Sequence, residues 1–199
     1  MRKIVVTEFL SLDGVMQDPH EWHFPFFDDE AGMFKDEEIR ETGALLLGRV
    51  TYEGFASAWP ERGRDMSGQP EPTDENSEDL FTDLFNWLPK YVVSDTLGED
   101  GASWTHSHII RGERMVDEIR ALKEQDGKHI YIHGSGKLIE SLAPTGLIDQ
   151  YNLMVHPIVV GKGQRLFPDG FPETTLELAE TRTYPKGIVT LIFRKPEND

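Results

Sequence analysis

The stretch His129-Ile-Tyr-Ile-His-Gly-Ser-Gly-Lys-Leu138 decides the fold class of this chain. Its first five residues are mostly β-branched or aromatic and predict a strand, and Gly134-Ser135-Gly136 ends that strand at once. Leu138, Ile139 and Leu142 then follow at helical spacing. A strand that passes through a glycine turn into a helix is typical of an α/β domain.

The same alternation extends in both directions from this stretch. Ala44–Gly48 is wholly apolar and predicts a covered strand, and Arg49–Ala58 after it predicts a helix. The remaining expected strands are Lys3–Leu10, Tyr91–Ser94, Ser107–Arg111 and Asp149–Val160, and the remaining expected helices are Glu30–Thr42, a segment that begins at a capping Ser77 and stops before Pro89, and Glu113–Glu124.

The chain closes with two more strands, Leu176–Tyr184 and Ile188–Lys195, around a turn that contains Pro185 and Gly187. These elements predict one α/β domain over residues 1–199, with a mixed, mostly parallel sheet and a C-terminal antiparallel hairpin. Residues 61–76 are polar and rich in glycine and proline, so we expect a mobile surface loop there.

Composition excludes several classes of function. The 199 residues include no cysteine, which rules out disulfides, thiolate metal sites and a cysteine nucleophile. The net charge of −16 argues against nucleic acid and anionic membranes as partners. The pairs His20/His23 and His106/His108 lack a third ligand at fixed spacing, so we expect no metal site.

Two glycine turns could bind anions. Gly134, Ser135 and Gly136 would let backbone amides approach a phosphate at a helix start, and Lys137 adds a positive charge. In the second turn, Gly48 precedes a helix start with Arg49 and Thr51, while Ser94 follows a neighbouring strand. The alternative for each is structural: a tight turn for the first, and a surface arginine with a helix cap for the second.

Several motifs in this order resemble the dihydrofolate reductase-like superfamily, and most closely the reductase domain of the bifunctional riboflavin-biosynthesis deaminase–reductase in a stand-alone bacterial form. The resemblance covers nearly the whole chain and rests on Thr7–Met16, Leu45–Phe55, Tyr91–Ser94, His129–Leu138 and Pro157–Phe167. It implies a three-layer α/β/α fold that binds NADPH at the carboxyl ends of its central strands.

By the same resemblance, Gly48, Arg49 and Thr51 would hold the adenosine phosphate and pyrophosphate, and Ser94 would lie near the adenosine ribose. Residues 134–137 would lie under the pyrophosphate. Two departures are visible. Asp95 follows Ser94 and would repel a 2′-phosphate, and His133 stands where the riboflavin reductases have a glutamate.

Three residues are candidates for proton handling during hydride transfer: Glu30, Asp13 and His133. Their alternatives are a solvated acid in a first helical turn, a turn aspartate, and a strand-end histidine bonded to backbone. Trp22 and Phe24 either stack on a planar substrate or fill the core.

The resemblance thus implies a cytoplasmic, homodimeric NADPH-dependent oxidoreductase, most like 5-amino-6-(5-phosphoribosylamino)uracil reductase. Its substrate would be a small heterocycle. Two alternatives stay open: a reductase of dihydrofolate or of another heterocycle, and a nucleotide-binding protein without catalysis.

Overall fold

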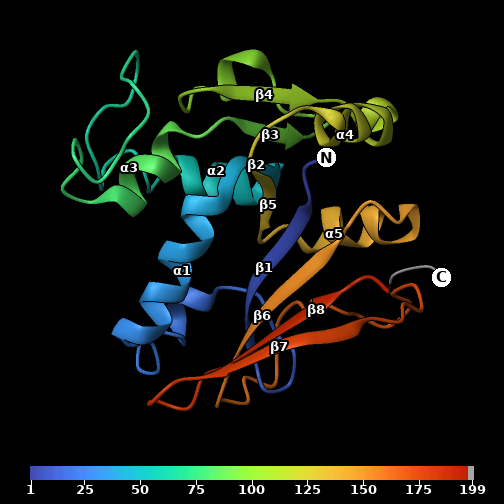
Figure 1. The fold of residues 1–199 in the computed structure, drawn as a ribbon. Coiled ribbons are helices and arrows are strands. Elements are labelled where there is room, and N and C mark those ends of the chain that lie inside the picture. The colour runs from blue at the N-terminus through green and yellow to red at the C-terminus, as the bar shows by residue number, and fades with distance from the viewer. Residues whose placement is uncertain (197–199) are drawn as a thin grey trace. The chain divides into compact units, whose positions relative to one another are not determined.

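The computed structural model describes residues 1–196, and its eight strands follow the hydrogen-bonded order β4-β3-β2-β5-β1-β6-β8-β7 (Figure 1). The described chain forms two compact units. The first contains Met1–Arg2 and Asp36–Tyr131, and the second contains Lys3–Lys35 and the chain from Ile132 onward. Strand β5 (His129–His133) begins in the first unit and ends in the second.

The first unit is built on parallel strands. Strand β2 pairs with β3 and with β5, and β3 in turn pairs with β4. Gly48 lies beside Val93 in the register, so the carboxyl ends of β2 and β3 meet at one edge. The elements of this unit are β2 (Thr42–Gly48), α2 (Arg49–Ala56), α3 (Leu80–Trp87), β3 (Lys90–Val93), η2 (Glu99–Gly101), β4 (Ser107–Ile110), η3 (Gly112–Arg114) and α4 (Met115–Glu124).

One apolar core joins helices α2 and α3 to β2 and β3 in this unit. Leu45, Leu47 and Val92 point from the strands toward Tyr52 of α2 and Phe85 of α3, and all five are buried. The apolar run in β2 therefore folds as a covered strand because helices bury it. This packing fixes where α2 begins, directly after Gly48.

The second unit combines a parallel pair with an antiparallel hairpin. Strand β1 (Ile4–Ser11) runs parallel to β6 (Gln150–His156), which pairs antiparallel with β8 (Val189–Arg194), and β7 (Glu177–Thr183) follows at the edge. Figure 1 shows the β7–β8 hairpin in red beside β6. The unit also contains η1 (Pro19–Glu21), α5 (Gly136–Leu142) and η4 (Ala143–Thr145).

Helix α1 (Asp29–Glu41) contributes its first half to the second unit. Ala31 and Phe34 pack there against Met154 of β6 and Ile192 of β8. Phe9, Phe26 and Phe27 extend the same apolar cluster. The aromatic segment before α1 is therefore part of a packed core.

The mixed, mostly parallel sheet and its terminal antiparallel pair confirm the predicted fold class. Several predicted boundaries were wrong by one or more residues, and three of them are described here. β6 ends at His156 and not at Val160, because Pro157 has no N–H to continue the ladder. Helix α2 ends at Ala56, two residues early. Helix α3 is capped by Asp79, whose carboxylate accepts from the Thr82 amide, and not by Ser77.

Residues 61–76 form turns and irregular backbone. Met66 within them is buried, and Arg64 pairs with Asp83 at 2.8 Å. The mobility of this loop stays a prediction.

Candidate functional site

The turn after β5 has an unusual backbone. Gly134 and Ser135 both have left-handed conformations, with φ of 64° and 68°, and Gly136 opens α5. A non-glycine residue in this region is uncommon, so Ser135 is held there by its surroundings. The Ser135 side chain makes no helix-capping bond. The amides of Gly136 and Lys137 begin the helix and therefore have no acceptor within it.

A pair of loops packs against this turn, and sequence reasoning missed its residues. A Cβ on Gly136 would collide with Gln164 Nε2 and lie 3.0 Å from Met16 Sδ. The Met16 amide donates to Gln164 O at 2.9 Å, and the Gln164 amide donates to Gln17 Oε1 at 2.9 Å. Gly136 is thus required by close packing. The sequence pointed to these loops only through the resemblance, which includes the motifs Thr7–Met16 and Pro157–Phe167.

Asp13 joins the same two loops. Its carboxylate accepts hydrogen bonds from Ser11 Oγ at 2.7 Å, from the Val160 amide at 3.0 Å and from the Gly161 amide at 2.9 Å. These bonds favour the charged form and lower the pKa of Asp13 to about 2. The group therefore stays ionised at neutral pH and positions the loop as a carboxylate.

A cluster of aromatic rings lies at the carboxyl ends of β1 and β6. His23 stacks on Phe9 with ring centroids 4.8 Å apart, and its ring lies edge-on to His156 at 6.0 Å. Trp22 and Phe27 complete the cluster. Trp22 is buried, whereas Phe24 is exposed. The Phe24 ring covers that of His23, with ring centroids 4.0 Å apart.

Both histidines of this cluster are buried. His156 Nδ1 donates to Met154 O at 2.9 Å, and within residues 1–196 its Nε2 and His23 Nδ1 have no hydrogen-bond partner. Burial, together with smaller effects of the nearby His156 and His20, lowers the pKa of His23 to about 4. Burial also lowers the pKa of His156. The two imidazoles are therefore neutral at pH 7.

His133 ends β5 directly before the Gly134 turn. Burial lowers its pKa well below the ordinary value, and the Lys35 ammonium lowers it further. Lys35 is itself buried, donates to Thr7 Oγ1 at 2.8 Å and lies 5.3 Å from the centroid of the Phe9 ring. A neutral imidazole beside a buried cation is thus placed at this strand end.

Glu30 lies in the first turn of α1 and is exposed. The acid that holds the helix start is Asp28, whose carboxylate accepts from the Ala31 amide at 2.9 Å and from the Lys186 amide at 3.2 Å. The structure does not bring Glu30 together with Asp13 through any hydrogen bond in the described chain.

In the first unit, Gly48 has extended backbone with φ of −82° and precedes α2. Arg49 Nη1 pairs with Glu53 Oε2 at 2.7 Å along the exposed helix surface. Thr51 is half-buried in the first turn of that helix. The charge of the Arg49 guanidinium, at the first position of α2, is thus already partly neutralised by Glu53 one turn later.

Ser94 lies just past β3, at the edge where β2 also ends. Its Oγ accepts from the amides of Thr96 at 3.1 Å and Leu97 at 2.9 Å, so it caps a turn. Asp95 accepts from the Gly112 amide at 2.8 Å. The four candidates of this unit, Gly48, Arg49, Thr51 and Ser94, therefore share one edge.

Residues 1–196 contain neither a metal-binding cluster nor a membrane-spanning helix. Among residues 1–196 no group of three or more His, Asp or Glu side chains is arranged to hold a metal ion. No helix in that range is long and apolar enough to span a bilayer.

Comparison with known proteins gives the family. Bacillus subtilis protein YyaP is 27% identical over 195 residues, which cover 96% of this chain and 94% of YyaP. The Thermotoga maritima diaminohydroxyphosphoribosylaminopyrimidine deaminase/5-amino-6-(5-phosphoribosylamino)uracil reductase superposes with a TM-score of 0.62 at 17% identity, covering 98% of this chain and 57% of that one. Enterococcus faecalis dihydrofolate reductase, in complex with NADP(H), superposes with a TM-score of 0.59 at 18% identity, covering 98% and 97%.

These two superpositions show the fold, and their identities are too low to show more. The sequence match is more specific, because residues 2–190 match the family described as the RibD C-terminal domain. The chain belongs to the RibD C-terminal domain family.

Proposed function

We propose that this protein is an NADPH-dependent reductase, most like 5-amino-6-(5-phosphoribosylamino)uracil reductase. Family membership over residues 2–190 supports a reductase of this superfamily. Two proteins of the same fold carry the names of reductases, and one of them was solved with NADP(H). Dihydrofolate or another small heterocycle is the alternative substrate.

The observation that carries the cofactor proposal is the turn at Gly134 and Ser135. Two consecutive left-handed residues lead into a helix whose first amides lack intrahelical acceptors, and this arrangement suits a phosphate. Lys137 adds an exposed positive charge. In the first unit, Gly48, Arg49, Thr51 and Ser94 are proposed as separate contacts to phosphate and ribose groups of the cofactor.

NADPH would supply a hydride when bound, and the chain's own residues would handle the charge that follows. Hydride transfer leaves negative charge on the acceptor unless a proton arrives with it. Of the three proposed catalytic residues, His133 is neutral and lies beside the Lys35 ammonium, so it can donate a hydrogen bond in a positive environment. Asp13 acts as an ionised positioning group, and Glu30 is left as the exposed acid.

The cofactor proposal is tested by placing a charge in the turn without changing its shape. Ser135→Asp puts a carboxylate beside the proposed phosphate, whereas Ser135→Asn is its neutral counterpart and tolerates the same backbone. We expect Ser135→Asp to weaken NADPH binding at least about tenfold by calorimetry, and Ser135→Asn to change it less than about threefold. Equal binding by both variants would remove the turn from the site.

A second candidate function is cofactor binding without turnover. The observation that favours it is that Asp13 is held ionised and His133 neutral, so neither is a ready proton donor at pH 7. Oxidation of NADPH with the riboflavin pyrimidine, dihydrofolate or a related heterocycle decides the matter. Turnover that is lost in His133→Ala or Glu30→Gln, while NADPH still binds, supports catalysis.

We also propose that the protein is a cytoplasmic homodimer. Both parts rest on family analogy. Light scattering that gives a monomer at micromolar concentration would overturn the dimer.

A further inference from the structure

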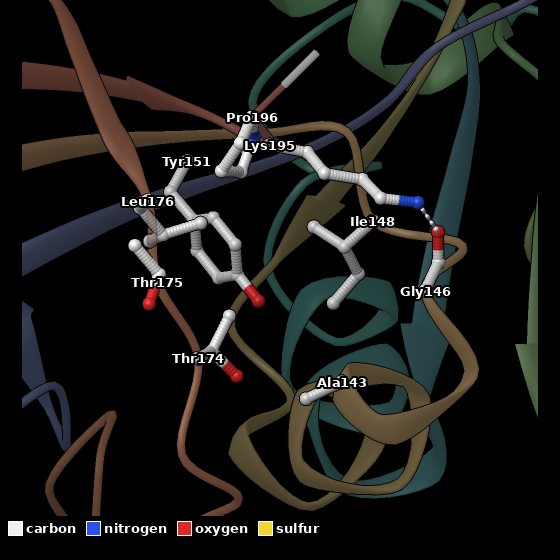
Figure 2. A pocket seen from close by; sticks show the side chains of 9 residues that line it. All are labelled: Ala143, Gly146, Ile148, Tyr151, Thr174, Thr175, Leu176, Lys195 and Pro196. Carbon is white, nitrogen blue, oxygen red and sulfur yellow. Dashed lines mark hydrogen bonds between the residues drawn. The ribbon is translucent and has the colours of Figure 1, made fainter. Parts of the chain in front are cut away.

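A pocket of about 190 Å³ lies in the second unit, at the amino end of β6 (Figure 2). Its walls come from η4, from the start of β6, from the segment before β7 and from the end of β8. The Gly134 turn lies directly before the start of α5, whereas the pocket lies beyond the end of that helix. His156 is the last residue of β6, whereas the pocket lies at the start of that strand. The pocket is therefore separate from the groups proposed for cofactor and substrate.

Tyr151 supplies a polar atom with no use elsewhere in the fold. Its side chain is 3% exposed, and its hydroxyl has no hydrogen-bond partner within residues 1–196. Figure 2 shows this hydroxyl pointing into the pocket, between Ile148 and Thr174. Burial raises the pKa of Tyr151 to about 12, so the phenol keeps its proton and can donate. A hydroxyl in this position is free for a ligand to accept from it.

Lys195 supplies the charge. Of the described residues that line the pocket it is the only charged one, in a chain with 36 acidic residues. Its Nζ donates to Gly146 O at 3.3 Å, and this leaves two of the three ammonium N–H groups for other acceptors. The side chain crosses the pocket toward Gly146 (Figure 2).

The rest of the lining is apolar or weakly polar. Ile148, Leu176 and Pro196 form apolar walls, and Thr174 and Thr175 add hydroxyls. The Thr174 hydroxyl already donates to Pro172 O at 3.0 Å. At about 190 Å³ the space is smaller than the roughly 300–1,000 Å³ typical of sites for drug-sized ligands, so a single ring fills it.

We propose that this pocket binds a small monocarboxylate with one ring or a short branched aliphatic body. The carboxylate accepts from the Lys195 ammonium and from the Tyr151 hydroxyl, and the apolar body lies against Ile148 and Leu176. An ammonium and a neutral phenol together favour an anion over a cation. No described residue of the lining is a carboxylate, so no group of the lining repels an anion at short range.

Benzoate is the probe, and benzamide is its neutral counterpart of nearly the same shape. In ¹H–¹⁵N spectra of the full-length protein, we expect saturable shifts at Gly146, Tyr151 and Thr175 with benzoate in the millimolar range. Benzamide should bind at least about fivefold more weakly, because it lacks the charge. Absence of saturable shifts with benzoate, or equal binding of the two probes, would overturn the proposal.

Two variants test the assigned groups. Lys195→Gln should weaken benzoate at least about fivefold and Tyr151→Phe at least about threefold. Lys186→Gln is the matched control, since Lys186 is an exposed lysine of the same unit whose Nζ donates to Phe27 O. Folding of both variants is verified by circular dichroism. Unchanged benzoate affinity in Lys195→Gln and Tyr151→Phe would mean that benzoate does not bind through these two groups, and this would overturn the proposal. NADPH binding should be the same in all three variants, so this test does not depend on the proposed function.

Discussion

His23 is a histidine that the fold keeps neutral. Phe9, Phe24 and Phe27 surround its ring, and His156 lies edge-on to it. None of these neighbours stabilises an imidazolium by an ion pair. The pKa of about 4 in the folded state is well below that of an unfolded histidine, near 6.5. The unfolded state therefore binds more protons between these two values.

Because of this difference, the free energy of unfolding should fall as the pH is lowered from about 6.5 to about 4, and change little from this group below that. The His23 contribution reaches roughly 3 kcal/mol at most. Urea unfolding measured across this range should show a shallower decline for His23→Phe, which keeps the ring contacts. His108→Gln removes an exposed imidazole that is not among the neighbours of His23, and it serves as control. An unchanged slope in His23→Phe would show that His23 does not titrate as described.

Arg49 offers a second test at the scale of one residue. Glu53 holds its guanidinium at 2.7 Å on the exposed surface of α2. If Arg49 contacts a phosphate of the cofactor, Glu53 competes with that phosphate. We expect Glu53→Gln to tighten NADPH binding about two- to fivefold, consistent with ~0.3–1 kcal/mol for an exposed pair. Calorimetry should show no such gain for Asp100→Asn, an exposed acid of the same unit, and a loss of affinity in Glu53→Gln would exclude the contact.

At the scale of elements, the loop between β1 and η1 is tied to the loop after β6 by one carboxylate. The Asp13 carboxylate accepts hydrogen bonds from the amides of Val160 and Gly161, and Arg165 Nε donates to Asp13 O at 3.0 Å. An asparagine at position 13 would retain one acceptor oxygen and present an amide group to the other donor. The two loops should then separate more often.

We therefore expect Asp13→Asn to speed deuterium exchange in residues 158–166 severalfold without changing exchange in β2 and β3. Asp169→Asn, which changes an exposed acid nearby, should leave the exchange as in the wild type. In the wild type the tie should weaken as the pH falls from about 3.8 to about 2, because protonation of Asp13 removes its negative charge and leaves it one full acceptor oxygen. Identical exchange in Asp13→Asn and wild type would mean that other bonds hold the loops.

The elements themselves were largely predictable, and the loops were not. Periodicity located β2, β5 and α4, because each carries an apolar pattern that its own packing explains. The strand predicted for β6 was too long because Ile158, Val159 and Val160 are residue types that favour strands. In the structure, Pro157 ends the hydrogen-bonded ladder before them. Local composition cannot show which backbone amides already have partners in another loop.

The candidate site shows the same limit. Sequence placed the Gly134–Lys137 turn and the Gly48–Thr51 turn, since glycine next to a helix start is a local signal. It did not find Lys35, Thr7 or Gln164, because their contacts join residues 28 or more positions apart. It also offered Asp13 as a proton donor, and the three hydrogen bonds that keep it ionised come partly from residues 160 and 161.

At the scale of the whole molecule, the net charge of −16 bears on any anionic ligand. NADPH carries several negative charges, so the acidic chain repels it at long range. Salt shortens the range of that repulsion, from roughly 30 Å at 0.01 M to about 8 Å at 0.15 M. Contacts at hydrogen-bond distance, such as those proposed for the Gly134 turn, are screened much less. The two effects therefore have opposite dependence on salt, and their balance can be measured.

We expect NADPH affinity to rise as sodium chloride increases from about 10 to about 150 mM, because general repulsion is screened before the local contacts weaken. NADH is the matched control, since it lacks the 2′-phosphate and should gain less over the same range. Calorimetric titrations at four or five salt concentrations give both slopes. A steep fall of NADPH affinity with salt would mean that Arg49 and Lys137 dominate binding, and that the acidic surface has no influence on this cofactor.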